Sequence, residues 1–266
     1  MAFMNGSPTL SDQKFGQETQ AARAVYGASY RTFTVGGTIT ALGVLMVLLV
    51  GSAAFGWSQT TSPVPQFNAI TGEQVGGQPS IPGFVFIGVI VALVAGLATA
   101  FKPTWARFTA PVYALGMGLW IGSLSAVYNH YYDGIVTQAL FATLGIFVAM
   151  LVLYATRIIK VTNRFVMIVA GATMGIFLMY LLAFVFQLFG AELTFLNDGS
   201  PLGILISVGI IIVAALNLAI DFAFIEKSSD HQVPKYMEWY AAFGVVVTLV
   251  WIYLEVLRLL AILNRR

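Results

Sequence analysis

Seven long apolar stretches dominate this sequence and restrict what it can fold into. The hydrocarbon core of a bilayer is about 30 Å thick, so a helix needs roughly 20 apolar residues to cross it. In lipid, only helices and closed barrels satisfy their own backbone hydrogen bonds, and stretches of this length favour helices. The predicted membrane spans are residues 33–57, 83–101, 109–128, 135–156, 165–189, 202–224 and 239–263.

The amino-acid composition agrees with a chain that is mostly immersed in lipid. Hydrophobic residues make up 59% of the 266 residues and charged residues only 9%, whereas about a quarter of a soluble domain is charged. We therefore expect an all-α integral membrane protein, in which residues 32–266 form a bundle of seven transmembrane helices. Residues 1–31 are polar and lack an apolar segment, so we interpret them as a cytoplasmic N-terminal tail rather than a signal peptide.

The distribution of Lys and Arg predicts how the bundle is oriented. Cytoplasmic loops carry an excess of these residues, and ten of the thirteen fall in the tail and in alternate loops. The intervening loops, residues 58–82, 129–134 and 190–201, hold none. This alternation places the N-terminus in the cytoplasm and, with seven spans, the C-terminus outside the cell membrane. The ten residues are Lys14, Arg23, Arg31, Lys102, Arg107, Arg157, Lys160, Arg164, Lys227 and Lys235.

Several kinds of chemistry are excluded or unsupported. The chain has no cysteine, which excludes disulfides, thiol catalysis and zinc–thiolate sites. Its two histidines, His130 and His231, fall in loops on opposite sides of the predicted membrane. We find no catalytic constellation, so we expect no enzyme activity, no bound cofactor, no resident metal and no nucleic-acid partner. The loop at residues 226–239, EKSSDHQVPKYMEW, alternates in charge and is predicted to be a solvated connector.

Asp221 is a carboxylate inside the sixth apolar stretch. A charged residue at the centre of a membrane helix costs roughly 2.5–3.5 kcal/mol, and such residues usually face the bundle interior or a water-filled cavity. Asp221 shares one helical stripe with Ser207, Ala214 and Asn217, at spacings of one or two turns. This polar stripe predicts a surface that faces protein rather than lipid.

The seventh stretch carries two more ionisable residues, Glu255 and Arg258. They are three residues apart, so they share a helical face and can form an ion pair; Arg258 can instead extend toward the outer headgroups. From the rise per residue, Asp221 and Glu255 differ in depth by about 7 Å. If helix tilt brought them together, one of the two would hold its proton near neutral pH. Loss of that proton would separate the helices and leave oxygen ligands suited to calcium.

Small residues recur at four-residue intervals on three of the spans. Such spacing lets helix backbones approach closely, either inside one bundle or between two copies. The residues are Gly88, Ala92, Gly96 and Ala100, then Ala114, Gly118, Gly122 and Ala126, then Gly171 and Gly175.

Four segments of the chain resemble one family of membrane proteins. They are VGGTITALGVLMVLLVGSAAFGW at 35–57, RIIKVTNRF at 157–165, LNLAIDFAFIE at 216–226 and MEWYAAFGVVVTLVWIYLEVLRLLAIL at 237–263. They are similar to the Bax inhibitor-1/YccA-like proteins, and most of all to a bacterial branch common in actinobacteria. The resemblance implies a seven-helix bundle with the last helix in its centre.

The resemblance also implies a function. Better-studied members of the family resemble a pH-dependent calcium leak in which paired acids on the last two helices sense protons. By motif, Asp221 matches the first acid and Glu255 the second, with Asn217 and Arg258 in support. The chain departs from the family in having YLE where members often have YLD, and Met117 where related sequences often have a glutamate. Its second span has no basic residue, so a basic partner for Asp221 would have to be Lys102, Arg107 or Arg258, or be absent.

A second class of function stays open. Some relatives resemble non-conducting modulators of other membrane proteins, such as a membrane-bound quality-control protease. A polar tail like residues 1–31 is compatible with that role, because a protease could grip it. The expected partners are therefore the lipid bilayer, calcium or another cation, or a membrane protein.

Overall fold

The structure is a computed structural model that describes Gln20 and residues 31–60, 79–190 and 200–265. Within these residues the chain forms seven helices that are long and apolar enough to cross a membrane, and no strand. The predicted fold class is therefore confirmed. The predicted tail, apart from Gln20 and Arg31, lies outside the described residues, as do residues 61–78 and 191–199 of two predicted outer loops. The long helices are α2 (Val35–Gln59), α3 (Gly83–Phe101), α4 (Ala106–Tyr131), α5 (Ile135–Ala155), α6 (Asn163–Leu188), α7 (Pro201–Asp230) and α8 (Met237–Asn264), with a 3-10 turn, η1 (Pro103–Trp105), before α4.

Side-chain caps fix where three of these helices begin. Thr34 accepts a hydrogen bond from the backbone of α2, Thr162 does the same for α6, and Ser200 for α7. Hydroxyl caps satisfy backbone N–H groups that have no partner inside the helix. At α7, Pro201 follows the cap at the position where its missing N–H costs nothing.

Three helices, α4, α7 and α8, extend at both ends beyond the apolar stretches that predicted them. The sixth span was expected to end at residue 224, but α7 continues to Asp230. The third was expected to begin at residue 109, but α4 begins at Ala106 and contains Pro111 near its start. Hydropathy marks only the part of a helix that lipid surrounds, whereas the backbone hydrogen bonds continue into the polar interface.

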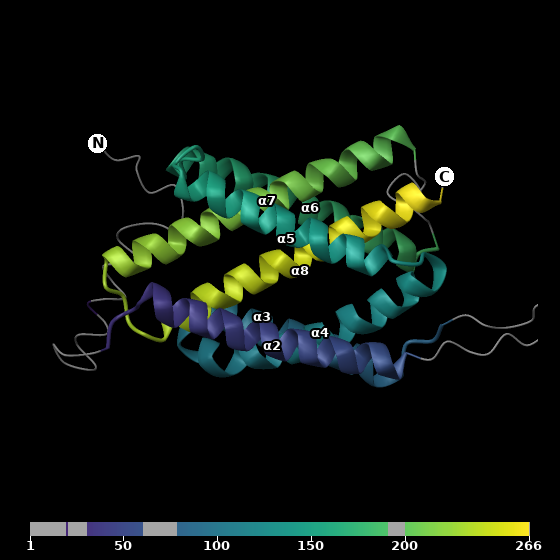
Figure 1. The fold of residues 1–266 in the computed structure, drawn as a ribbon, viewed down its shortest axis with the longest axis horizontal. Helices are drawn as coiled ribbons and strands as arrows, with labels where there is room; N and C mark the ends of the chain where they lie inside the picture. The colour runs from purple at the N-terminus through teal and green to yellow at the C-terminus, as the bar shows by residue number, and fades with distance from the viewer. Residues whose placement is uncertain (1–19, 21–30, 61–78, 191–199, 266) are drawn as a thin grey trace, which may run out of the picture.

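Helix α8 lies in the centre of the bundle (Figure 1). It runs between a group formed by α2, α3 and α4 and a group formed by α5, α6 and α7, and it contacts α2, α4, α5 and α7. In its most apolar window, 61% of the residues are buried, against 11–50% in the other six helices. The central position that the family resemblance implied is therefore confirmed.

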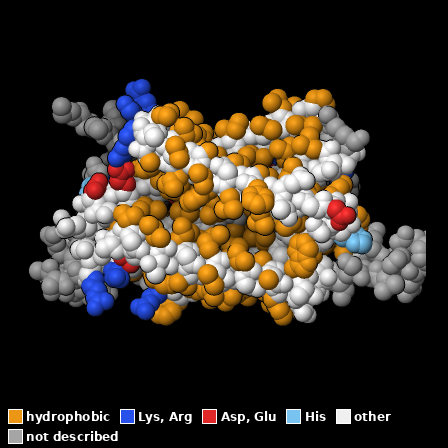
Figure 2. Space-filling view, in the orientation of Figure 1, with side chains coloured by type: hydrophobic (Ala, Val, Ile, Leu, Met, Phe, Trp, Pro, Cys, Tyr) orange, Lys and Arg blue, Asp and Glu red, His pale blue; other side chains and the backbone are white. Residues whose placement is uncertain are grey.

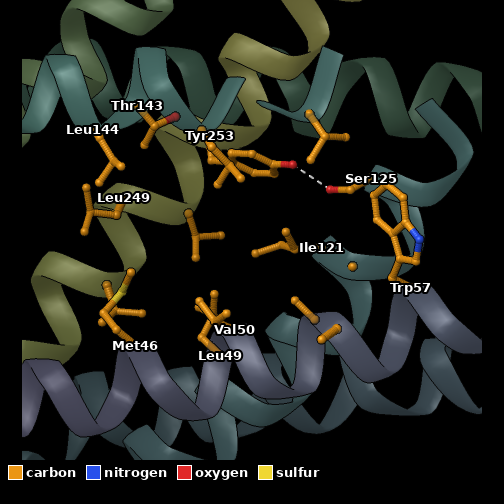
Figure 3. Close-up of a pocket in the computed structure, with 17 residues that line it drawn as sticks. Met46, Leu49, Val50, Trp57, Ile121, Ser125, Thr143, Leu144, Leu249 and Tyr253 are labelled. Carbon is orange, nitrogen blue, oxygen red and sulfur yellow. Dashed lines mark hydrogen bonds between the residues drawn. The ribbon is translucent and has the colours of Figure 1, made fainter. Parts of the chain in front are cut away.

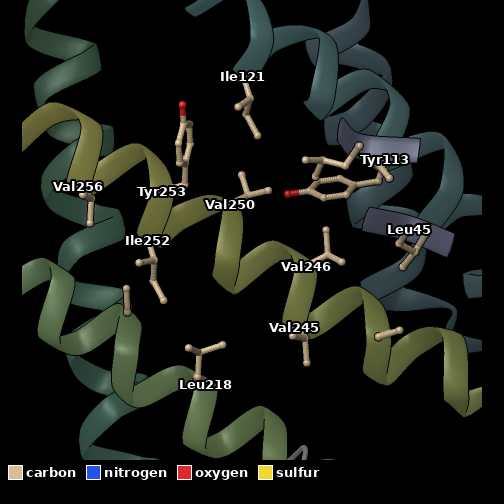
Figure 4. Packing of buried hydrophobic residues seen from close by; sticks show 14 of the residues in the cluster. Leu45, Tyr113, Ile121, Leu218, Val245, Val246, Val250, Ile252, Tyr253 and Val256 are labelled. Atoms are coloured by element: carbon tan, nitrogen blue, oxygen red, sulfur yellow. The ribbon is translucent and has the colours of Figure 1, made fainter. Parts of the chain in front are cut away.

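The core around α8 is built from β-branched residues packed against both large side chains and alanines of the neighbouring helices (Figure 4). Val245, Val246 and Ile252 are almost completely inaccessible. Leu45 of α2 and Leu218 of α7 are equally buried in the same cluster. Fixed, branched side chains fill the space between helices with little loss of rotamer freedom, which favours one arrangement of α8.

The outer surface of the helices is apolar. Large hydrophobic side chains such as Ile87, Phe141 and Ile168 are more than half exposed, and the face in Figure 2 is hydrophobic across its middle, with Lys and Arg gathered at one end. An apolar surface of this extent, on seven helices long enough to cross a bilayer, indicates contact with lipid. The bundle is therefore a multi-pass membrane protein.

Small residues bring α2, α3 and α4 into direct backbone contact. A methyl group on Gly122 of α4 would overlap the backbone of Ala53 in α2, and one on Gly116 would overlap that of Gly88 in α3. The predicted close packing of the second and third spans is confirmed. On α6 the prediction of close packing inside the bundle is wrong, because a methyl group on Gly171 or Gly175 would meet nothing within 4 Å.

The connector between α7 and α8 is not the solvated loop that its charges suggested. Val233 is fully buried in a small cluster with Phe33 and Met237. The backbone of Phe33 donates to Val233 across 2.8 Å, and Thr32 and Pro234 form an antiparallel bridge. The alternating charges lie on only part of the loop, and its apolar residues anchor the segment that enters α2.

Candidate functional site

Asp221 faces α8 and accepts a hydrogen bond from it. The Thr248 hydroxyl donates to Oδ2 of Asp221 across 2.7 Å. The carboxylate lies beside Gly244, where an added methyl group would stand 3.1 Å from Oδ1. Gly244 and Thr248 are one helical turn apart, so together they form a recess on α8 that fits the Asp221 side chain.

Glu255 lies in a second polar cluster that joins α6, α7 and α8. Tyr180 of α6 donates to Oε1 of Glu255 across 2.6 Å, and Nη2 of Arg258 lies 2.9 Å from Oε2. The same Arg258 nitrogen donates to Ser207 of α7 across 3.2 Å, and the guanidinium lies over the Tyr180 ring. The side chains of Glu255 and Arg258 are 7% and 16% exposed. The predicted ion pair is present, and Arg258 is turned into the bundle.

The two acids are not partners of each other. Asp221 bonds to Thr248, whereas Glu255 bonds to Tyr180 and Arg258. Thr248 and Glu255 are seven residues apart on α8, roughly 10 Å along its axis. The shared-proton arrangement, which required the two carboxyls to meet, is not what this structure contains.

Asn217 connects α7 to α6 rather than to α8. Its amide donates to the Thr173 hydroxyl and to the Val213 carbonyl, each across 2.9 Å. Ser207 and Ala214, from the same predicted stripe, are fully buried. The stripe therefore faces protein, as expected, but its members contact two different helices.

The chain was compared with family models, with curated proteins and with solved structures. The model described as "Bax inhibitor 1 like" matches residues 7–265. The chain belongs to this family. No curated protein and no solved structure matches it.

In this Bax inhibitor-1-like protein, the basic partner of Asp221 is absent from the described residues. Arg258, one of three candidates, is bound to Glu255 and Ser207. Lys102, the second candidate, lies over the Trp105 ring, 4.4 Å from its centre. Arg107, the third, is exposed in the first turn of α4 and forms no ion pair with Asp221. Asp221 therefore has a neutral hydroxyl as its partner, in a segment that lipid surrounds on its outer side.

Sequence reasoning missed a third acid, Glu226, at the end of the family's LNLAIDFAFIE segment. Its carboxylate accepts hydrogen bonds from the Tyr154 hydroxyl and from both terminal nitrogens of Arg157. The hydrogen bond to Glu226 raises the pKa of Arg157 above its ordinary value. This contact joins the end of α5 to α7. Arg157 has a positive φ of 59°, a conformation that no sequence pattern marks.

A fourth acid, Glu238, caps the start of α2 from another helix. Its Oε1 accepts from the Thr34 backbone N–H at 3.0 Å and from the Thr34 hydroxyl at 2.9 Å. The absence of a side chain at Gly37 makes room for this carboxylate. Negative charge at a helix N-terminus is stabilising, so Glu238 fixes α2 to the first turn of α8. No sequence pattern marks this contact, because Thr34 and Glu238 are 204 residues apart.

Proposed function

We propose that this Bax inhibitor-1-like protein is a pH-sensitive cation leak in which Asp221 binds the controlling proton. One observation carries the proposal: Asp221 lies between α7 and α8, and its only hydrogen-bond partner among the described residues is the Thr248 hydroxyl. An ionised carboxylate without a cation is costly in a membrane helix. The packing of α7 against α8 is therefore coupled to whether Asp221 carries a proton.

The proposed mechanism follows from that coupling. With a proton on Asp221, the carboxyl is neutral and the recess at Gly244 and Thr248 holds α7 against the central helix. Without the proton, the charge is stabilised best by water and cations, so α7 separates from α8 and admits them. Carboxylate and hydroxyl oxygens are hard ligands, which favours calcium as the transient ion.

Glu255 has a different part in this proposal. Arg258 balances the charge of Glu255 at Oε2, and Tyr180 of α6 donates to Oε1. Because Arg258 also donates to Ser207 of α7, this cluster holds α6, α7 and α8 together at a point further along α8. Asn217 supports the site by fixing α7 to Thr173 of α6. Asp221 is the group that responds to pH, and the Glu255 cluster is the fixed end about which α7 moves. The proposed activity is transport, without a catalytic residue or bound cofactor.

We place the protein in the cell membrane, with its N-terminus in the cytoplasm and its C-terminus outside. The excess of Lys and Arg in alternate loops supports this orientation. It puts Asp221 nearer the cytoplasmic end and Glu255 nearer the outer half. A change in cytoplasmic pH would then reach Asp221 over the shorter distance.

The second candidate is a non-conducting regulator of another membrane protein, such as a quality-control protease. The pairing of Thr32 with Pro234 supports it, because this pairing fixes where the N-terminal segment leaves the bundle. A partner that held that segment would act directly on the connector between α7 and α8. Co-purification with and without residues 1–25 tests this role, and loss of a specific partner on truncation would support it.

The test of the leak is calcium flux into liposomes that hold the purified protein, at about pH 6 and about pH 8, on either side of neutrality. We expect flux that depends on pH in the wild type, and no such dependence in Asp221→Asn. Glu255→Gln should retain the dependence, since Glu255 is already paired. Asp133→Asn, which changes an exposed acid in the turn before α5, is the matched control. Flux no greater than in empty liposomes, at both values, would overturn the proposal.

A further inference from the structure

A large apolar cavity lies between α2, α4, α5 and α8, apart from both acid clusters (Figure 3). Its volume is about 580 Å³, within the range of about 300–1,000 Å³ that is usual for small-molecule sites. Seventeen residues line it and none of them is charged. Neither Asp221 nor Glu255 is among them, so the cavity is independent of the proposed leak.

The cavity opens sideways toward lipid. Its walls on α2 and α5 include Val50 and Leu140, which are 57% and 50% exposed, whereas Val246 of α8, at its base, is fully buried. The exposed walls belong to the apolar stretches of α2 and α5, so the opening lies at the level of the hydrocarbon core. A molecule dissolved in the bilayer can therefore enter without crossing water.

The hydroxyls of Ser125 and Tyr253 form a hydrogen-bonded pair in a lining that is otherwise mostly apolar. Of the other polar groups there, the Thr143 hydroxyl donates to the Ala139 carbonyl of its own helix across 2.8 Å, and Trp57 contributes its indole N–H. Ser125 of α4 and Tyr253 of α8 share a hydrogen bond of 2.6 Å, and Figure 3 shows it beside the cavity. Both side chains are buried. Two hydroxyls carry two hydrogens, and their mutual bond uses only one. Among the described residues neither hydroxyl has another hydrogen-bond partner, so one donor remains for an acceptor inside the cavity.

The lining decides what kind of acceptor fits. A water molecule takes up only about 30 Å³, so water bound at the hydroxyl pair would leave most of the 580 Å³ cavity against apolar side chains. A charged headgroup would be buried without a counter-charge, which costs several kcal/mol. An uncharged molecule with an apolar body and an oxygen acceptor satisfies both the donor and the lining.

We propose that this cavity binds an uncharged, lipid-soluble molecule that carries an acceptor oxygen, which the Ser125–Tyr253 pair recognises. The body of the ligand lies between α2 and α5 and its oxygen points toward α8. Because α8 is also the helix that receives Asp221, a ligand here contacts the same central helix from its opposite side.

The test uses two probes of equal length, tritium-labelled 2-tetradecanone and tetradecane, which differ by one carbonyl oxygen. Their saturable binding is measured on the full-length protein in phosphatidylcholine nanodiscs, after subtraction of binding to empty nanodiscs. We expect saturable binding of the ketone and much weaker binding of the alkane. A net hydrogen bond of about 1–1.5 kcal/mol corresponds to roughly a tenfold difference in affinity.

Three variants locate the binding. Val50→Trp places a large side chain at the opening and should abolish saturable ketone binding. Val47→Trp is the matched control, since Val47 is on the same helix, 73% exposed and not part of the lining. The double variant Ser125→Ala with Tyr253→Phe should bind the ketone about as weakly as the wild type binds the alkane.

Two outcomes would overturn the proposal. Equal affinity of the wild type for ketone and alkane would mean that hydrocarbon simply fills the cavity. Absence of saturable binding for both probes would mean that no ligand site exists. The comparison of the two probes on the wild type decides the matter even if the double variant fails to fold.

Discussion

The hydroxyl of Thr248 donates to the carboxylate of Asp221 across 2.7 Å, and this bond joins α7 to the central helix α8. Asp221 and Thr248 are 27 residues apart in sequence. On α8, Thr248 is separated by seven residues, roughly 10 Å along the helix axis, from Glu255, the other acid that the family resemblance implied. The two acids are therefore separate sites. Asp221 has a neutral hydroxyl as its partner, and the charge of Glu255 is balanced by Arg258.

The first prediction concerns this bond. Replacing Thr248 by Val keeps the shape of the side chain but removes the donor, which leaves the partly buried Asp221 carboxylate without its hydrogen bond. We expect Thr248→Val to lower the free energy of unfolding by about 1–3 kcal/mol, measured by SDS titration in mixed micelles. Thr248→Ser keeps the hydroxyl and should lose much less. Equal stability of the two variants would show that the hydrogen bond contributes nothing.

The overall fold was predictable because lipid imposes it. Seven apolar stretches long enough to cross a bilayer leave helices as the simplest solution, and each of them is a helix in the structure. The helix ends were not predictable to the same degree. At α7 the polar residues after Phe224 remain helical to Asp230, because hydropathy reports the surroundings of a helix rather than its backbone.

The candidate site was predictable only where it is local. Glu255 and Arg258 are three residues apart on one helix, and that spacing alone predicts their ion pair. Tyr180 and Thr248 could not be assigned in this way, since each belongs to a different helix from the acid it serves. Contacts between helices depend on rotation and tilt, which one sequence without its relatives does not reveal.

The second prediction concerns the close contact of α2 and α4. A methyl group at Gly122 would overlap the backbone carbonyl of Ala53, so the two helices would have to separate. We expect Gly122→Ala to lower the free energy of unfolding by about 1–3 kcal/mol. Gly171→Ala is the matched control, because the space around Gly171 is open and alanine is the better helix former by up to about 1 kcal/mol. Similar effects of both changes on SDS unfolding would contradict the packing described.

The third prediction concerns the buried ion pair. Arg258→Met leaves Glu255 in the bundle without its cation, and breaking a buried pair in this way costs about 3–5 kcal/mol. Adding Glu255→Gln removes the unbalanced charge and should restore most of the stability. A double-mutant cycle on the free energy of unfolding measures the coupling between the two. Additive effects would show that the 2.9 Å contact has no energetic role.

The fourth prediction tests the orientation of the bundle, and the absence of native cysteine makes it direct. Lys160→Cys, between α5 and α6, should react with a membrane-impermeant maleimide only from the cytoplasmic side. Asp133→Cys and Asn264→Cys should react only from outside. These last two must behave alike in either orientation, because Arg265 donates to the Tyr132 hydroxyl across 3.3 Å and so joins the end of α8 to the turn before α5. Labelling of all three from one side would contradict the bundle itself. Labelling of each from the opposite side would reverse the orientation, and would place Asp221 nearer the outer surface.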